Sequence, residues 1–333
     1  MNSAAPHPLS PAETEDLQTQ LASLCKAAAD SLRLRILRVL RHDAMDVSEL
    51  CAVLDVRQPA LSHHLKLMSA AGLLCSQRDG NHIFYRRQEL GVDEPFAALQ
   101  QALLAAADTL ELDRNEEARR EELQRQREQN SLDFFTNNVS RFREQQDLIA
   151  APERYASAVN SLLNALPVTR RKTALEVGPG DGWLLPRLCG QFDRVVALDN
   201  APAMLDSARA TAAALDNIEF VLGDTRHEVL SSLRADLIVI NMVLHHTPDP
   251  ATTLREAASA LAPGGVLLIT ELCEHQQGWA RENCGDLWLG FAPELLGDWA
   301  AAAGLKELTG SYLGQRNGFK LQLRLFGAAK NTS

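Results

Sequence analysis

A short glycine-rich stretch at residues 175–182 most constrains what this chain can fold into. An apolar run that ends in Glu176 is followed by glycines at alternate positions, Gly178, Gly180 and Gly182, and then by residues that can open a helix. Glycines permit positive φ angles and let a ligand approach the backbone, and a helix N-terminus offers unpaired N–H groups. The stretch therefore predicts a β-strand, a tight turn and a helix start at a ligand site.

Further apolar runs follow this turn, as expected for strands that alternate with helices. The second run ends at Asp199, where an acidic side chain about 20 residues beyond the glycines can accept both hydroxyls of a ribose. Later runs end at Asp224 and Asn241, and another covers residues 265–270. A helix is expected near 295–303, and two alternating segments predict a final antiparallel pair of strands, 306–313 and 318–326.

This spacing resembles that of the class I S-adenosylmethionine (SAM) methyltransferases, over about 175 residues. In that family the first turn has the form acid-x-G-x-G-x-G, which Glu176 and the three glycines match. A dinucleotide-binding turn would instead space its glycines G-x-G-x-x-G beneath a pyrophosphate, which Glu176 would repel. The resemblance implies a Rossmann-like α/β domain with a seven-stranded sheet that binds SAM or S-adenosylhomocysteine (SAH).

The resemblance also implies roles for single residues. Glu176, Gly178 and Gly180 would hold the amino acid end of the cofactor, and Asp199 its ribose hydroxyls. The remaining cofactor-binding residues would be Asn200 and Met204 beside the adenine, Asp224 at its exocyclic amine, and Asn241 and Leu244 beside the methionine moiety. No catalytic residue is assigned, because transfer from a sulfonium mainly needs alignment and exclusion of water.

Three groups of side chains in this half leave their roles open. His245 and His246 either supply a general base or, for the first of them, pack under the ligand. Trp279, Trp288 and Phe291 either line an acceptor pocket or cover the methyl position, or they simply close the core. Arsenic methyltransferases need several thiols near the sulfonium, and this region has two, at Cys273 and Cys284.

The N-terminal part predicts a helix-turn-helix. Two helices are expected within 21–40, after a mobile tail at 1–18. Asp46 and Glu49 form a capping-box pattern that opens a helix at 47–54, and a second helix is expected at 58–71. Leu61, Leu65 and Met68 would face the core, whereas Gln58, Ser62, His63 and Lys66 would face outward, with His64 half-buried. Such polar side chains can reach base edges and phosphates in a major groove.

Two β-prone runs around Asp79 and Gly80, at 73–77 and 82–87, predict a hairpin behind these helices. A helix-turn-helix followed by a hairpin is a winged helix, and Arg78 at its tip would contact the minor groove or a phosphate. The chain from 21 to 91 carries a charge of +3 within a protein of net charge −10, which favours a nucleic-acid surface at this end.

This half resembles the ArsR-type bacterial repressors over about 75 residues, through the segments 47–50, 58–66 and 78–85. It departs from the family at Arg57, where a Ser or Thr usually caps the helix. It also departs at Cys51, which is followed by Val53 where the metal-sensing members carry a second cysteine. One thiol cannot form a thiolate set, so no metal site is expected.

The segments between the two motifs predict dimerisation and linkage. A helix at 92–110, with a stripe of Phe96, Leu99, Leu103 and Leu110, forms the dimer interface in ArsR-type proteins, or else packs on its own domain. A dimer would read a pseudo-palindromic operator in double-stranded DNA. Residues 111–130 predict a charged helical connector with Glu116/Arg120 and Glu121/Arg125 pairs. An aromatic patch follows, with a lid or coupling element expected at 134–143: Phe134, Phe135, Val139 and Phe142.

Composition places the chain in the cytoplasm. It has no run of 18 apolar residues and no basic region ahead of an apolar one at its start, so neither a membrane span nor a signal peptide is expected. Its six cysteines are scattered without a C-x-x-C motif, as in proteins with reduced thiols. The 333 residues predict two or three domains.

These expectations combine into a multidomain protein. Residues 19–110 would form a winged helix for DNA binding and dimerisation, 111–150 a helical linker and lid, and 151–328 a SAM-binding domain. The whole resembles bacterial fusions, some of which respond to SAH, so we expect a transcriptional regulator whose ligand alters operator binding. An active small-molecule methyltransferase with a self-regulating DNA-binding domain is the alternative, and an arsenical sensor with methylating activity is a third. The methyl acceptor, the operator and the sign of regulation stay open.

Overall fold

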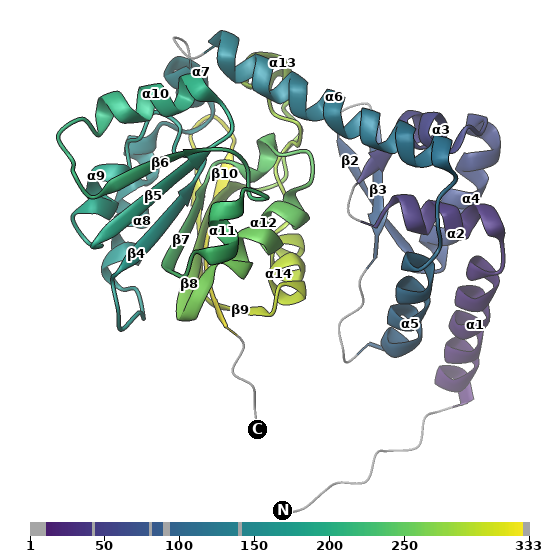
Figure 1. Ribbon diagram of the computed structural model, residues 1–333. Helices are drawn as coiled ribbons and strands as arrows, with labels where there is room; N and C mark the ends of the chain where they lie inside the picture. Colours follow the sequence, from purple (N-terminus) through teal and green to yellow (C-terminus); the bar gives the residue numbers. More distant parts are fainter. Residues whose placement is uncertain (1–10, 42–43, 80–81, 89–93, 139–141, 329–333) are drawn as a thin grey trace, which may run out of the picture. The chain divides into compact units, whose positions relative to one another are not determined.

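The computed structural model describes residues 11–41, 44–79, 82–88, 94–138 and 142–328, and it divides into two compact units. The first unit ends at Gln124 and the second begins at Arg125, inside the long helix α6, Arg114–Asn138 (Figure 1). The boundary lies within the segment expected to link the domains. Val139, which the sequence placed in an aromatic patch, lies outside the described residues, and so does the Phe142 side chain.

The first unit is a winged helix. Its helices and strands run in the order α1 Pro11–Ala28, α2 Ser31–Val39, β1 Met45–Asp46, α3 Val47–Leu54, α4 Gln58–Ala70, β2 Leu74–Asp79, β3 His82–Arg87 and α5 Ala97–Asp108. The three strands form an antiparallel sheet in the order β1-β3-β2. The predicted helix-turn-helix and hairpin are confirmed. The expected tail is wrong for residues 11–18, which already belong to α1.

Local sequence signals explain where the helix-turn-helix begins. Asp46 accepts a hydrogen bond from the Glu49 backbone N–H, and the Glu49 side chain accepts one from the Asp46 N–H, so the capping box is confirmed. Helix α4 begins behind Arg57, which makes no side-chain cap, with Pro59 in its first turn. Leu61, Leu65 and Met68 of α4 are fully buried in the aliphatic core of this unit.

The apolar stripe predicted on the helix after the hairpin is not the face that its own unit buries, and the dimer interface expected there stays a prediction. Helix α5 instead buries Ala97, Gln100, Leu104 and Ala107. The Gln100 amide donates to the Gly72 carbonyl at 2.7 Å, which fixes that face of the helix inward. Leu99 and Leu110 remain 41% exposed on the surface of this unit.

The first half of α6 is more than a solvated spacer. Glu116 is 2% exposed and forms an ion pair with Arg35 of α2, and not the expected i,i+4 pair with Arg120, which pairs with Glu117. Arg119 donates to the Val53 carbonyl at the end of α3, at 2.8 Å. The helix is thus attached to the helix-turn-helix by charged contacts that composition alone does not indicate.

The second unit has a Rossmann-like sheet of seven strands in the order β6-β5-β4-β7-β8-β10-β9, as expected. The strands are β4 Thr173–Val177, β5 Arg194–Asp199, β6 Ile218–Leu222, β7 Ala235–Asn241, β8 Leu261–Leu272, β9 Leu305–Gly314 and β10 Lys320–Ala328. The first five are parallel to one another and β10 is antiparallel to both its neighbours. The chain leaves β4 towards β6 and returns to β7 on the other side of β4, so the strand order reverses there, where open α/β sheets bind their ligands.

Helices cover both faces of this sheet (Figure 1). One face packs on α8 Pro152–Asn164, α9 Leu185–Cys189 and α10 Pro202–Thr211, with Val159, Leu185 and Ala208 in a common core. The other face carries α11 Glu228–Ser232, α12 Pro250–Ser259 and α14 Pro293–Ala302. The remaining helices are α7 Phe142–Ala150, the 3₁₀ turn η2 Leu244–His246 and α13 Trp279–Cys284. No helix in the described ranges combines the length and apolarity that a bilayer crossing requires.

Candidate functional site

The glycine turn after β4 brings backbone to the reversal point of the sheet. Gly178, Gly180 and Gly182 have φ angles of +66°, +59° and +79°, a region that side chains disfavour. A Cβ on Gly178 would lie 2.5 Å from a methyl of Val243, so this position has no room for a side chain. The expected helix start is displaced, because α9 begins only at Leu185 and has five residues. The turn itself, and not a helix dipole, therefore forms this edge of the site.

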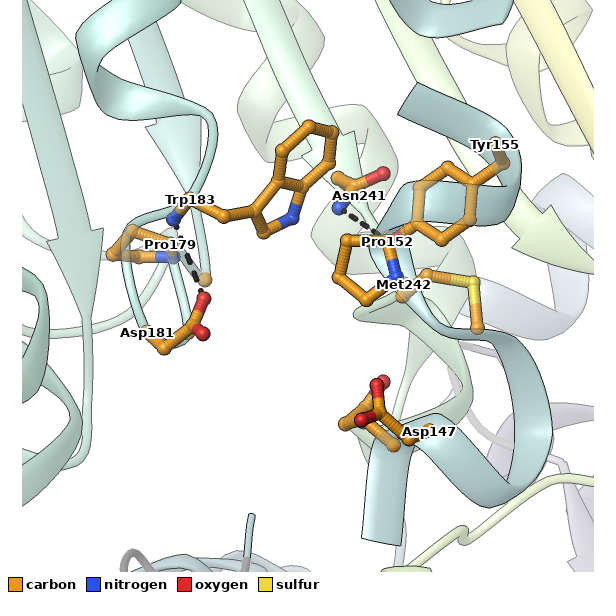
Figure 2. A pocket seen from close by; sticks show the side chains of 11 residues that line it. Asp147, Pro152, Tyr155, Pro179, Asp181, Trp183, Asn241 and Met242 are labelled. Atoms are coloured by element: carbon orange, nitrogen blue, oxygen red, sulfur yellow. Dashed lines mark hydrogen bonds between the residues drawn. The ribbon is translucent and has the colours of Figure 1, made fainter. Parts of the chain in front are cut away.

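A cleft opens beside this turn (Figure 2). One wall is the turn from Gly178 to Trp183, and the facing wall comes from the end of β7 and from α7 and α8. Its lining residues are Gln146, Asp147, Pro152, Tyr155, Gly178, Pro179, Gly180, Asp181, Trp183, Asn241 and Met242. Two carboxylates and no basic side chain are in this set, so the described lining favours a cationic ligand over an anionic one.

Buried polar atoms near the cleft lack partners among the described residues. The Asn241 Oδ1 atom accepts no hydrogen bond, while its amide donates to the Tyr155 hydroxyl at 3.4 Å. The Glu176 side chain is 1% exposed and its Oε2 atom is also unpartnered. Burial, and then the charges of Asp181 and Asp199, raise the pKa of Glu176 well above its usual value. A ligand that brings an ammonium group would offset this cost, so the residues present fit the amino acid end of SAM or SAH.

The backbone is strained directly after the end of β7, beside the cleft. Met242 follows Asn241 directly and has a φ of +58°, although it is not a glycine. Its backbone N–H donates to the Thr270 carbonyl on β8 at 2.8 Å, which holds the residue in this conformation. Side chains held in disfavoured backbone regions gather at ligand sites, so Met242 supports the assignment of the cleft.

Asp199 ends β5 on the neighbouring strand, as expected. Its Oδ1 atom accepts from the Ala201 N–H at 2.9 Å, and burial raises the pKa of the carboxyl to about 6. Asp224 ends β6, and both its oxygens are already held by Arg226, through the backbone N–H at 2.8 Å and the guanidinium at 2.5 Å. Asn200 is exposed, whereas Met204 and Leu244 are buried.

The structure therefore brings together some of the cofactor-binding residues that the sequence predicts. Gly178, Gly180 and Asn241 line the cleft itself. Sequence reasoning missed the lining residues that come from before the glycine turn, Gln146, Asp147, Pro152 and Tyr155, and it missed Asp181, Trp183 and Met242. A wall contributed by the segment ahead of β4 was expected, but at 134–143 and not at α7 and α8.

The histidine pair lies in the core behind the end of β7. His245 is fully buried, and its Nδ1 atom lies 2.5 Å from the Glu271 carboxylate. Burial alone would lower the pKa of His245, but the charges of Glu271 and Asp286 outweigh it and raise that pKa. Burial lowers the pKa of His246 well below its usual value. Neither histidine is among the residues that line the cleft, which disfavours a general base and agrees with the packing interpretation.

The aromatic residues after β8 close the core and do not line the described cleft. Trp288 is 5% exposed, with its indole N–H on the Thr247 carbonyl at 2.8 Å, and Phe291 is 1% exposed. Trp279 packs edge-on against Phe319. The burial of Trp288 and Phe291, and the absence of all three side chains from the described cleft lining, disfavour the acceptor-pocket interpretation.

Burial raises the pKa of each thiol that the arsenic interpretations require. Burial raises the pKa of Cys284 to about 12 and also raises that of Cys273. Burial, with the Asp46 charge second, raises the pKa of Cys51. Arsenicals and soft metals bind thiolates, so the pKa values of these cysteines disfavour both arsenic interpretations.

The expected DNA-contacting residues share the outer face of α4. Gln58, Ser62, His63 and Lys66 are all exposed, while Leu61, Leu65 and Met68 on the opposite face are buried. His64 is half-buried as expected, with its Nδ1 atom 3.3 Å from Arg33 Nη1. Arg78 is exposed, but it lies within β2, paired in register with Ile83, and not in the turn. The turn at residues 80–81 lies outside the described residues.

Comparison with known proteins agrees with the division of the chain into two different units. Residues 30–76 match the family model of the bacterial regulatory proteins of the arsR family, and residues 175–269 match that of a methyltransferase domain. A trans-aconitate 2-methyltransferase of Methylobacterium radiotolerans is 39% identical over 111 residues, 32% of this chain and 41% of that protein. An uncharacterized methyltransferase of Mycobacterium bovis is 36% identical over 118 residues, 35% of this chain and 46% of that protein. The chain spans under half the length of these curated relatives.

Solved structures give weaker likenesses. The N-methyltransferase NodS from Bradyrhizobium japonicum, in complex with SAH, has a TM-score of 0.43 and 20% identity over 52% of this chain and 85% of that chain. A DhpI–SAH complex has a TM-score of 0.42 and 21% identity over 61% of this chain and 97% of that one. Methyltransferase domains of the matched family use SAM. The chain thus joins a helix-turn-helix domain of the arsR family to a SAM-type methyltransferase domain.

Proposed function

We propose that this protein is a DNA-binding transcriptional regulator whose methyltransferase-like domain binds SAM or SAH and thereby modulates operator binding. The observation that carries the proposal is the presence, in one chain, of an exposed polar recognition helix and a cleft with unpartnered buried polar atoms. The exposed polar helix can contact DNA, and a small ligand bound in the cleft would stabilise the folded protein.

On the DNA side, α4 would enter the major groove. Gln58, Ser62 and Lys66 stand on one face at helical spacing, with His63 beside them, so one groove can meet all four. Arg78 on the wing strand would contact a phosphate or the minor groove. The exposed Leu99 and Leu110, with Leu21 of α1 at 37% exposure, offer an apolar surface for a homodimer that reads a pseudo-palindromic operator.

On the ligand side, Glu176 and Asn241 would satisfy the ammonium group, and Asp199 would accept the ribose hydroxyls. Gly178 and Gly180 would let the ligand lie against the backbone. Asn200, Met204 and Asp224 would surround the adenine, and Leu244 would pack near the methionine moiety. SAM supplies a methyl group already activated by its sulfonium, whereas SAH has none to give.

A chain of charges connects this ligand site with α6. Arg226 holds Asp224 at 2.5 Å and Glu128 of α6 at 2.9 Å with the same guanidinium nitrogen. A ligand amine that engages Asp224 would weaken its hold on Arg226 and so change the pairing of α6. Because α6 continues from the attachment points at Glu116 and Arg119, its position can influence the recognition helix. A coupling of about 1–3 kcal/mol would change operator affinity roughly 5- to 150-fold.

A gel-shift titration on the DNA upstream of the gene, with SAM and SAH added separately, tests the proposal. One of the two should shift the apparent affinity severalfold. Asp199→Ala should abolish this response and leave DNA binding intact, and Glu128→Gln should weaken the response while the ligand still binds. If both ligands bind the protein and neither alters DNA affinity, the regulatory proposal fails.

An active small-molecule methyltransferase is the second candidate, because the matched curated relatives are named as methyltransferases. A tricarboxylate acceptor such as that in the name of one relative fits this cleft poorly, since Asp147 and Asp181 would repel it. Transfer of a labelled methyl group from SAM to a neutral or amine acceptor would support this candidate. Its absence across such acceptors, with SAH still bound, would favour the sensor.

A further inference from the structure

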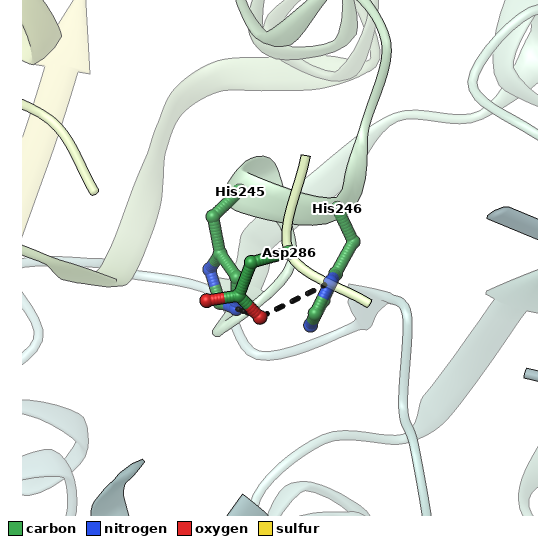
Figure 3. A group of neighbouring side chains, drawn as sticks. All are labelled: His245, His246 and Asp286. Atoms are coloured by element: carbon green, nitrogen blue, oxygen red, sulfur yellow. Dashed lines mark ion pairs between the residues drawn. The ribbon is translucent and has the colours of Figure 1, made fainter. Parts of the chain in front are cut away.

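A cluster of buried side chains behind the cleft is not used by the proposed function. His245, His246 and Asp286 are 0%, 7% and 3% exposed, and one ligand atom from each lies within 4.8 Å of the others (Figure 3). The Asp286 Oδ1 atom is 3.9 Å from His245 Nε2 and 3.9 Å from His246 Nδ1. These separations are too long for hydrogen bonds and leave space between the side chains.

Neighbouring groups fix the orientation of both imidazoles. His245 Nδ1 lies 2.5 Å from Glu271 Oε1, and that oxygen also accepts the Leu272 N–H at 2.6 Å. His246 Nδ1 lies 3.2 Å from the Gly285 carbonyl. In the neutral form both rings would use Nδ1–H as a donor and keep a lone pair on Nε2, and neither Nε2 has a hydrogen-bond partner among the described residues. An imidazole held by an acceptor at one nitrogen, with the other nitrogen open, is the usual state of a metal ligand.

We propose that His245, His246 and Asp286 bind a divalent transition-metal ion of the zinc type, with the fourth position left for water. Two imidazoles and a carboxylate form a ligand set that zinc and related ions accept. Bonds of roughly 2.0–2.2 Å place tetrahedral ligand atoms roughly 3.5 Å apart, close to the 3.9 Å that separates Asp286 Oδ1 from His245 Nε2.

The ion would stabilise the packing of the C-terminal part of α6 within the second unit. The Ser131 hydroxyl of α6 donates to the His246 carbonyl at 3.3 Å, and the Phe135 ring packs edge-on against the His246 ring at 4.9 Å. Phe134 fills the space beside Gly285, next to Asp286. An ion held by His246 and Asp286 would therefore fix the two segments on which this end of α6 rests.

The test is a titration of the full chain, stripped with a chelator, with Co²⁺ as an optical probe and then with Zn²⁺. We expect stoichiometric binding of a single Co²⁺ with the intense visible absorption of four-coordinate sites, its loss when Zn²⁺ displaces the probe, and a higher unfolding midpoint with either ion. Absence of a visible band at saturating Co²⁺, together with an unchanged midpoint, would overturn the proposal.

Variants identify the ligands. Asp286→Asn keeps the shape of the side chain and should abolish the Co²⁺ band, and Glu271→Gln should weaken binding roughly 10- to 100-fold. His275→Gln is the matched control, because this half-buried histidine lies outside the cluster and should bind as the wild type does. If Asp286→Asn does not fold, the wild-type spectrum still decides. A thiolate-to-cobalt band that disappears in Cys284→Ala would assign the ion to cysteine and contradict the proposed ligands.

Discussion

The recognition helix and the ligand cleft place their polar side chains in opposite environments. On α4 the polar residues are exposed and pay no desolvation cost, and the packing of the helix depends on leucines and a methionine on its other face. At and beside the cleft, Asn241 Oδ1 and Glu176 Oε2 are buried and unpartnered among the described residues. DNA recognition should thus be separable from stability by surface substitution, whereas ligand binding and stability should change together.

The largest effect is expected at the glycine turn. Gly178→Ala places a methyl 2.5 Å from Val243, so it should lower the free energy of unfolding by up to about 3 kcal/mol and weaken SAH binding by displacing the turn. Gly304→Ala is the matched control, because Gly304 also has a positive φ, of +76°, but an added Cβ there would meet nothing within 4 Å. Calorimetric titration with SAH measures both. Equal affinities for the two variants would remove the turn from the ligand site.

A smaller effect, on operator affinity and not on stability, is expected from substitutions on the exposed face of α4. Gln58→Ala should weaken operator binding by about 1–3 kcal/mol, the usual discrimination from one good base contact. Its unfolding midpoint should not change, because the side chain is exposed. Gln276→Ala removes the same amide from an exposed position in the second unit and should leave gel shifts unaltered. A loss of stability in Gln58→Ala would contradict the expectation that DNA binding by the exposed face of α4 is separable from the stability of the fold.

The fold was largely predictable, because its signals are local. The capping box at Asp46, the inward Leu61 and Leu65, and the acidic residue that ends β5 follow from patterns within a few residues. The carboxyl ends of β4, β5 and β7 then lie side by side because parallel strands pair. Most of the cofactor-binding expectations depend on this geometry alone.

What could not be predicted depends on contacts between distant segments. The burial of Glu116 requires Arg35 from another helix, and the wall formed by Gln146 and Tyr155 requires the folding of α7 and α8 over the sheet. Asp286 meets the histidine pair only because the segment after β8 returns across the end of η2. Hydrophobic periodicity contains no information about such pairings.

The pH dependence of SAH binding is expected to be moderate. Burial raises the pKa of Asp199 to about 6, and ribose hydroxyls need the ionised carboxylate as acceptor. SAH affinity should therefore fall as the pH drops below about 6, approaching tenfold per unit for this one group. The stability of the ligand-free protein should change in the opposite direction. As the pH falls from about 6 to about 3.9, the pKa of Asp in an unfolded chain, protonation of Asp199 favours the folded state.

Calorimetric titrations with SAH from about pH 7 to about pH 5 check this dependence. Asp199→Asn should bind weakly at every pH and lose this part of the slope. A wild-type slope that survives in full in Asp199→Asn would assign the titration to Glu176, whose pKa is also raised by burial.

The smallest effect tests whether the surface of the first unit also contributes to its stability. Asp46→Ala removes the cap of α3 and should cost about 1 kcal/mol of unfolding free energy. Asp46 also lies 2.6 Å from the exposed His82 of the wing strand β3, so the same side chain joins the wing to the helix-turn-helix. A double-mutant cycle with His82→Ala, followed by denaturant unfolding, separates the two contributions. If the cycle gives no coupling, the cap alone explains the loss, and the wing is then positioned by its strand pairing. A coupling above the cost of the cap would show that the exposed His82 side chain does affect the fold of the first unit, and the contrast with the cleft would narrow.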